Sequence, residues 1–316
     1  MGITKNHLDS ETIIDIFSNK FPNKKIENIK ELTEGMFNAT YDITFEDGSE
    51  SILKVSPKDK QGLMSNEINL MWAEVQAMQI MKKYDFVHVA EVQLYDNSKE
   101  LCDSGYFVME RIEGENWIFI KDGMSKTEKD IIHNEIGVIH KNMSSIKNEK
   151  FGLLGDSKRF DTLYEFFNML MCNVLDDVDA RDIEIGVPKN AILAQLEKDQ
   201  FAFDEVKVPS LVHWDMWEGN IFVKNNHVSG VIDWERAMWG EPFMDDRFRR
   251  HSRNEEFLKG YGQKDFSNNE MRRINWYDVF LFITMMAEVT YRQYSDNGQY
   301  YWVKPLLESA WNDLIS

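Results

Sequence analysis

Apolar and β-branched residues gather in short runs in the first third of the chain. Two such runs, Asn38–Phe45 and Ser51–Val55, stand on either side of Glu46-Asp47-Gly48-Ser49. An Asp-Gly pair between two strand-like segments is typical of a β-hairpin, because glycine tolerates the positive φ that such turns need. Two later runs, Val87–Tyr95 and Tyr106–Ile112, also predict strands. This region is therefore expected to be rich in β-structure.

Elsewhere apolar residues recur at helical spacing. A first helix is expected from Asp9 or Ser10, and a longer one from about Asn66 to Lys83. After Ile112 the pattern is mainly helical, with helices expected at residues 125–143, 162–178, 190–199 and 267–294. Two of these begin with capping boxes, Ser125-Lys126-Thr127-Glu128 and Ser267-Asn268-Asn269-Glu270. One β-hairpin is expected between them, with strands at residues 210–212, 220–223 and 228–232.

This order of elements predicts two lobes. Residues 1–110 would form a β-rich N-terminal lobe and residues 111–316 a mainly helical C-terminal lobe, joined near Glu110–Gly114. A length of 316 residues suits two lobes around a cleft better than one small core. We therefore expect an α+β protein with two lobes.

The composition narrows the possible partners. Lys and Arg number 36 against 54 Asp and Glu, a net charge of −18, so the surface should repel nucleic acids and anionic membranes. The longest apolar stretch, Val279–Ala287, is far too short to span a bilayer. The two cysteines form no disulfide framework, and the first ten residues lack the apolar core of a signal peptide. A cytoplasmic protein is expected.

The strongest chemical signal is the octapeptide His213-Trp214-Asp215-Met216-Trp217-Glu218-Gly219-Asn220. It fits H-x-D-x-x-x-x-N, the pattern of a kinase catalytic loop. Phosphoryl transfer needs a carboxylate that orients the attacking hydroxyl and accepts its proton, the role expected of Asp215. It also needs a neutral oxygen ligand for magnesium, the role expected of Asn220. An ordinary polar loop between two strands remains an alternative for this segment alone.

A second signal follows the hairpin after Asn220. The apolar run Val231-Ile232 ends in Asp233, which would place a carboxylate at the mouth of the same cleft. Magnesium prefers oxygen ligands, so Asn220, Asp233 and the phosphates of a nucleotide would complete its site. The two signals together favour a kinase over a polar loop.

At these positions the chain resembles the aminoglycoside phosphotransferase and choline kinase-like family, which has a protein-kinase-like fold. Besides the catalytic loop, the resemblance rests on segments 32–41, 52–55 and 232–242, the last with Asp233-Trp234-Glu235-Arg236-Ala237 and Gly240-Glu241-Pro242. One departure is Trp214, because the family usually has glycine between the histidine and the catalytic aspartate. Protein kinases place arginine there, so a side chain can fit.

The resemblance also implies how a nucleotide is held. Gly35 would lie in the nucleotide loop, within Leu32-Thr33-Glu34-Gly35-Met36. Backbone groups of Glu110 and Ile112 would hydrogen-bond the base. The phosphate donor would be ATP or GTP, bound with Mg²⁺.

By the same resemblance, Lys54 would contact the α- and β-phosphates and pair with a glutamate of the following helix. Glu67 and Glu74 are both candidates for this partner. We prefer Glu74, because it lies in the stretch that matches the family better.

Two charged clusters stand out in the second half of the chain. The densest acidic patch comprises Asp176, Asp177, Asp179, Asp182 and Glu184. In the family this region flanks the acceptor, so we expect a cationic acceptor there. A basic cluster is most simply interpreted as a solvated helix face; it comprises Arg247, Arg249, Arg250 and Arg253.

The predicted function is therefore transfer of the γ-phosphate of ATP or GTP to a hydroxyl of a small molecule. An aminoglycoside antibiotic is the leading acceptor, as in an antibiotic-resistance enzyme. A metabolite kinase for choline, fructosamine or another sugar amine is one alternative. A catalytically silent nucleotide-binding module is another, although Asp215, Asn220 and Asp233 are all present. The oligomeric state does not follow from the sequence.

Overall fold

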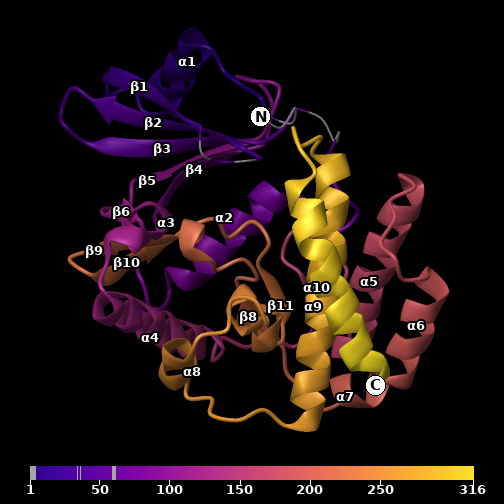
Figure 1. Cartoon of the computed structure of the whole chain (residues 1–316). Coiled ribbons are helices and arrows are strands. Elements are labelled where there is room, and N and C mark those ends of the chain that lie inside the picture. The colour runs from indigo at the N-terminus through magenta and orange to yellow at the C-terminus, as the bar shows by residue number, and fades with distance from the viewer. Residues whose placement is uncertain (1–4, 34, 36, 59–61) are drawn as a thin grey trace.

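The computed structural model describes residues 5–33, 35, 37–58 and 62–316, and it has two lobes (Figure 1). The N-terminal lobe is built on a five-stranded antiparallel sheet in the order β1-β2-β3-β5-β4. Two helices complete it. The elements of this lobe are α1 (Ser10–Lys20), β1 (Ile26–Leu32), β2 (Ala39–Phe45), β3 (Glu50–Val55), α2 (Leu70–Met81), β4 (Val92–Asp96) and β5 (Tyr106–Glu110).

Local sequence signals set the first helix and the first hairpin. Asp9 caps α1 by accepting a hydrogen bond from Thr12 N at 2.8 Å. The β2–β3 turn contains Gly48 at φ 80°, a conformation that favours glycine. Both elements lie where the sequence predicts them.

The two faces of the sheet are buried in two different hydrophobic cores. Leu53 and Val108 pack with α1 in a small hydrophobic core of the N-terminal lobe. Ile52 and Phe107 point to the other face and join the large core that continues into the C-terminal lobe. Because side chains alternate along a strand, Lys54 shares the face of Ile52 and points toward α2. The helix α2 therefore belongs to the same core as the C-terminal lobe.

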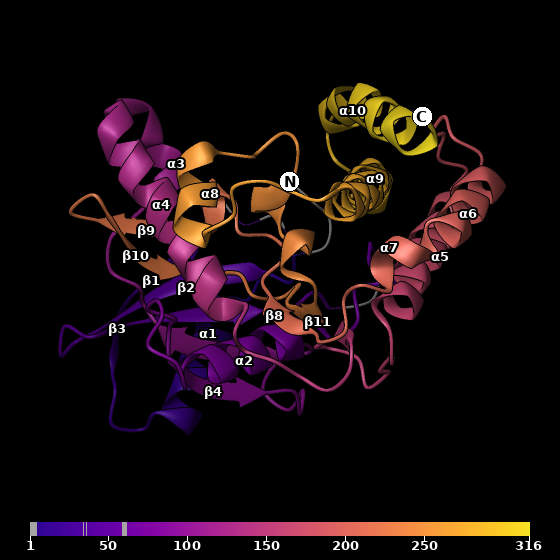
Figure 2. The same cartoon turned by 90° about the horizontal axis from the view of Figure 1, so that it is seen from below.

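The C-terminal lobe is mainly helical, with two small three-stranded sheets in the orders β10-β9-β6 and β7-β11-β8. Figure 2 shows α9 beside α10 and α4 beside α8, with α5, α6 and α7 on one side. No helix in the described part of the chain is long and apolar enough to cross a membrane. The strands are β6 (Glu115–Asn116), β7 (Gly152–Leu153), β8 (Ser210–Val212), β9 (Ile221–Lys224), β10 (His227–Val231) and β11 (Met238–Gly240). The helices are α3 (Trp117–Ile120), α4 (Lys126–Met143), α5 (Leu163–Ala180), α6 (Lys189–Lys198), α7 (Gln200–Phe203), α8 (Glu255–Tyr261), α9 (Asn268–Tyr291) and α10 (Gly298–Ile315).

The predicted helices of this lobe are confirmed, and their first residues follow the capping signals. Ser125 opens α4 and Ser267 opens α9, each with a complete capping box. Thr162 opens α5 with a third one.

Three predictions differ from the structure. The helix expected from Asn66 begins at Leu70, because Asn69 has a left-handed φ of 47° that helical geometry excludes. The strand expected from Val87 begins at Val92. The strand β8 does not pair with the β9–β10 hairpin; it pairs with β11, a strand that the sequence pattern does not reveal.

The segment 62–69, which leads into α2, is fastened to the C-terminal lobe. Ser65 N and Ser65 Oγ donate to the two carboxylate oxygens of Asp177, at 2.8 and 2.6 Å. Asn66 Nδ2 donates to Leu170 O at 2.9 Å. Both partners lie on α5, so this segment holds α2 against the helical lobe.

The basic cluster is not a solvated helix face. Arg247 and Arg249 are each only 1% exposed, and they lie in a stretch of 3₁₀ turns between β11 and α8. Arg247 Nε donates to Met216 O at 2.7 Å, inside the catalytic loop. The sequence interpretation was wrong for these two residues, because Arg247 bonds the loop and Arg249 donates to Phe243 O and Met244 O.

Candidate active site

The proposed catalytic loop, residues 213–220, follows β8 directly. A hydrogen bond between two of its own residues holds its ends together. Asn220 lies at the end of a 3₁₀ turn, Glu218–Asn220, and its Nδ2 donates to Asp215 O at 2.8 Å. Because the amide nitrogen is used in this way, the Oδ1 atom of Asn220 remains for another partner. The five-residue spacing of Asp215 and Asn220 thus brings both side chains to one place.

His213 joins the catalytic loop to the segment that carries Asp233. The His213 Nδ1 atom accepts from Asp215 N at 3.3 Å, and Nε2 lies 3.0 Å from Ile232 O. This pattern puts the ring proton on Nε2, which then donates to the carbonyl. His213 is fully buried, and burial lowers its pKa, so the neutral ring is favoured.

Asp233 lies at the point where the chain turns out of β10, with a left-handed φ of 65°. Its Oδ1 atom accepts from Lys54 Nζ at 2.7 Å. Lys54 Nζ also lies 2.8 and 2.7 Å from the two carboxylate oxygens of Glu74 on α2. Glu67 is engaged elsewhere, with Arg236 at 3.0 Å. Of the two glutamates considered from the sequence, the structure places Glu74 against the lysine.

The charges of this triad stabilise one another. Burial alone would lower the pKa of Lys54, but Asp233 and Glu74 outweigh it and raise that pKa above its ordinary value. Burial likewise opposes ionisation of Asp233, but Lys54 keeps the pKa of that carboxyl below its usual range. The site therefore holds a charged lysine beside an ionised aspartate.

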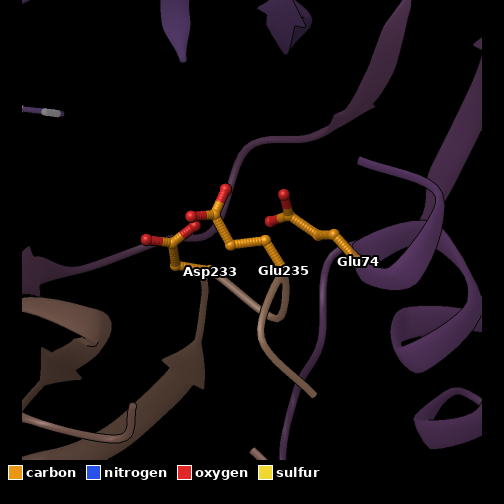
Figure 3. Close-up of side chains that lie close together, drawn as sticks. All are labelled: Glu74, Asp233 and Glu235. Carbon is orange, nitrogen blue, oxygen red and sulfur yellow. The ribbon is translucent and has the colours of Figure 1, made fainter. Parts of the chain in front are cut away.

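A third carboxylate, Glu235, lies in the same cluster. Single oxygen atoms of Glu74, Asp233 and Glu235 lie within 4.8 Å of one another, and Figure 3 shows Glu74 pointing from α2 toward the other two. Asn38 Nδ2, from the start of the first hairpin, donates to Glu235 Oε2 at 2.9 Å. Burial, followed by the charge of Asp233, raises the pKa of Glu235 to about 8. Sequence reasoning did not assign a role to Glu235, although its position two residues after Asp233 was a usable signal.

The two predicted metal ligands, Asn220 and Asp233, carry donor atoms that fit a hard divalent cation. The Asn220 amide oxygen and the carboxylate of Asp233 are the oxygen ligands that Mg²⁺ prefers. Asp233 is half-buried, and Asn220 is 5% exposed. Such a site leaves coordination positions for water or phosphate oxygens.

Asp215 is half-buried beside a second charged network. Burial raises the pKa of Asp215 well above its ordinary value, and the guanidinium of Arg236 opposes this rise. Arg236 is held in turn by Glu67 and by Glu288 of α9. A raised pKa makes the carboxylate a better proton acceptor.

Trp214 occupies the position at which the family usually has glycine. Its φ is 76°, in the left-handed region that disfavours large side chains. The side chain is 6% exposed, and Arg236 lies over its ring at 5.0 Å. Its indole Nε1 has no hydrogen-bond partner among the described residues. The bulky residue thus carries a conformational cost at the centre of the catalytic loop.

The predicted nucleotide loop and hinge are only partly described. Gly35 is exposed, and its neighbours Glu34 and Met36 lie outside the described residues. At the end of β5, Glu110 N donates to Glu91 O at 2.9 Å. No hydrogen bond within the described residues uses the backbone N–H of Ile112, two residues further on.

The acidic patch is less free than its sequence suggests. Lys189 lies 2.6 Å from Asp176 and 2.7 Å from Asp179, so both carboxylates are paired. Asp177 is 5% exposed and holds Ser65. Asp177 is therefore a buried structural residue, Asp176 and Asp179 share one lysine, and the cationic acceptor expected at this patch stays a prediction.

Comparison with known proteins shows which family the chain matches. A model of the phosphotransferase enzyme family matches residues 28–246. No match is found among curated protein sequences. Three similar solved structures are a candidate aminoglycoside phosphotransferase from Ralstonia eutropha, a candidate fructosamine-3-kinase from Thermobifida fusca, and the streptomycin–ATP–APH(2")-IIa ternary complex.

These structures are similar along nearly their whole length. The first has a TM-score of 0.68 at 15% identity, with 98% of both chains covered. The second has a TM-score of 0.69 at 13% identity, covering 96% of this chain and 100% of the other. The third has a TM-score of 0.62 at 18% identity, covering 96% and 97%. The predicted protein-kinase-like fold is thereby confirmed.

Proposed function

The chain belongs to the phosphotransferase enzyme family, and on that premise we propose that it transfers the γ-phosphate of ATP or GTP to a hydroxyl of a small molecule. The observation that carries the proposal is the meeting of two pairs of residues in one place. Asp215 and Asn220 lie on one loop, and Lys54 reaches Asp233 from the other lobe. Phosphoryl transfer depends on positioning and on charge stabilisation, which such an arrangement supplies.

Each residue has a distinct role in the proposal. Asp215 orients the acceptor hydroxyl and takes its proton, since its raised pKa suits a general base. Lys54, held by Glu74, contacts the α- and β-phosphates. The free N–H of Ile112 and the carbonyl of Glu110 bind the base. Gly35 lies in the loop that covers the phosphates.

Asn220 and Asp233 would hold Mg²⁺ through their side-chain oxygens. When bound, this ion would neutralise charge on the transferring phosphate. His213 keeps the two metal-binding segments in register, because it bonds both Asp215 N and Ile232 O.

Aminoglycosides are the first acceptors to test. APH(2")-IIa has been solved with streptomycin and ATP, and APH(2")-IIia with GDP and kanamycin. Choline and fructosamine-type sugar amines come second, since a candidate fructosamine-3-kinase has the same fold. The cytoplasm, with its reduced thiols, suits the two free cysteines.

The test is release of nucleoside diphosphate, measured with ATP and with GTP, with and without Mg²⁺, against a panel of aminoglycosides, choline and sugar amines. We expect diphosphate release that depends on both Mg²⁺ and an acceptor. Nucleotide binding without turnover of any hydroxyl-bearing molecule would instead support a catalytically silent nucleotide-binding module.

A further inference from the structure

A cavity of about 50 Å³ that opens to solvent lies beside the proposed catalytic loop. It is bounded by the start of α2, by α5, by α9 and by the segment after Asp233. Trp214 forms one wall, and Trp214 and Asp215 are consecutive. The proposed catalytic residue therefore directly follows a residue of the cavity wall along the chain.

The lining of this cavity is mostly apolar. Most of its area comes from aliphatic, methionine and aromatic side chains; examples are Ile68, Leu70, Leu170, Trp214, Met238 and Phe280. These side chains come from both lobes and from the catalytic loop itself. Small-molecule sites are usually apolar in this way, with a few polar groups that fix orientation.

Two of the charged groups at the cavity, Glu67 and Arg236, are ion-paired within the protein. Glu67 accepts from Arg236 and from Arg292, whereas Glu235 accepts from the neutral amide of Asn38. Arg236 is bound by a second carboxylate, Glu288. A cationic ligand would have to break one of these pairs to gain the carboxylate of Glu67, and breaking a buried pair is costly.

From this cavity we infer that the acceptor carries an apolar group, a ring or branched hydrocarbon, which enters the space beside Trp214 while its hydroxyl faces Asp215. The inference rests on the proposed phosphoryl transfer and changes its acceptor class. A polycationic aminoglycoside would meet a mostly apolar wall here, and the carboxylate of Glu67 is already held by two arginines. Trp214, where the family usually has glycine, would select the acceptor.

The experiment uses two primary alcohols that differ only in the apolar group, cyclohexylmethanol and ethanol, with ATP and Mg²⁺. A single methylene in an apolar pocket changes kcat/KM roughly tenfold or more. We therefore expect cyclohexylmethanol to be favoured over ethanol by at least about tenfold in kcat/KM. A ratio near one in the wild-type protein would overturn the inference.

Two variants locate the effect by filling the cavity from two different helices. Thr284→Met fills it from α9, and Leu170→Phe fills it from α5. Each should reduce the preference for cyclohexylmethanol to less than about twofold, with little change in the KM for ATP. Thr290→Met, at an exposed threonine on the same helix, is the matched control and should keep the preference. A preference that survives both cavity variants, each shown to be folded by its thermal transition, would place the apolar site elsewhere.

A binding measurement separates this inference from the proposed function. Saturation-transfer NMR with cyclohexylmethanol needs no turnover, and its signal should be present in wild type and lost in both cavity variants. If no alcohol or aminoglycoside is phosphorylated but this signal behaves as expected, the cavity site stands and the proposed function fails. If kanamycin is the best acceptor and the cavity variants leave its KM unchanged, the proposed function stands and this inference fails. Absence of the signal in wild type would also overturn it.

Discussion

Lys54 and Asp233 lie 179 residues apart in the sequence, yet Lys54 Nζ donates to Asp233 Oδ1 over 2.7 Å. The lysine comes from β3 of the N-terminal sheet and the aspartate from the end of β10. The pair therefore connects the two lobes at the point where phosphates and metal are proposed to bind.

Replacing Asp233 should remove the magnesium dependence of nucleotide binding. Asp233→Ala deletes the proposed metal carboxylate and one of the two partners of Lys54. Titration of ATP with and without Mg²⁺ measures the effect, and Asp265→Ala, at an exposed aspartate, is the control. An unchanged response to Mg²⁺ in the Asp233 variant would contradict the assignment.

Replacing Asp215 should affect the chemical step alone. Asp215→Asn keeps the shape of the side chain but removes the proton acceptor, so kcat should fall by about 10²- to 10⁴-fold. The Kd for ATP should stay nearly unchanged, because the base contacts the acceptor. Asp204→Asn, at an exposed position, controls for the substitution. Turnover within a few-fold of wild type would show that another group accepts the proton.

The two glutamates near α2 can be separated by a matched pair of variants. Glu74→Gln removes the charge that holds Lys54, and hydrogen bonds to charged groups are worth enough to raise the KM for nucleotide by about tenfold or more. Glu67→Gln alters only the network with Arg236 and Arg292, and should leave that KM within about twofold. Equal effects of the two variants would argue against a phosphate-binding Lys54–Glu74 pair.

Asp177 should contribute to the stability of the fold rather than to attraction of a cationic acceptor. It is buried and accepts two hydrogen bonds from Ser65, so Asp177→Asn should lower the free energy of unfolding by about 1–3 kcal/mol. Asp176→Asn, at the exposed neighbour, should change it by no more than about 0.5 kcal/mol. Urea unfolding of both variants measures the difference. If the two were equally stable, the fastening of segment 62–69 through Asp177 would be unimportant.

His140 should make the protein sensitive to acid. Burial lowers the pKa of His140 to about 3, whereas an unfolded histidine titrates near 6.5. Between these values the unfolded chain binds one more proton at this residue, so its contribution to stability is complete above about pH 6.5 and is lost as the pH falls. The loss is about 1.4 kcal/mol per pH unit.

His140→Phe removes this titration and can keep the edge-to-face contact with Phe257. Urea unfolding between pH 7 and pH 5 should therefore show a shallower loss of stability in the variant. His7→Phe, at an exposed histidine, should retain the wild-type slope. Identical slopes in His140→Phe and wild type would exclude this residue as the source.

The proposed catalytic loop and Asp233 could be found in the sequence because their spacing is local. Asp215 and Asn220 are held together by a bond within one loop, and Asp233 follows one hairpin later. The capped starts of α4 and α9 were predictable for the same reason, since a capping box spans four residues.

What the sequence did not reveal depends on contacts between distant segments. The pairing of β8 with β11 and the burial of Arg247 and Arg249 arise only when the chain is folded. The late start of α2 has the same origin, because Ser65 and Asn66 bond α5 instead of continuing the helix. The division at residue 110 stays a prediction, and it is complicated by α2, which precedes that point but packs in the core of the helical lobe.

The hydrogen bonds that attach segment 62–69 to α5 affect how the two lobes can move relative to each other. Because α2 is anchored to the helical lobe while Lys54 lies on the sheet, a hinge that separates the sheet from that lobe would draw Lys54 away from Glu74. The same movement would break the bond from Asn38 to Glu235. One movement would then both open the cleft and separate its charged residues. The open protein would admit a nucleotide but could not act on it until the sheet returned to its place.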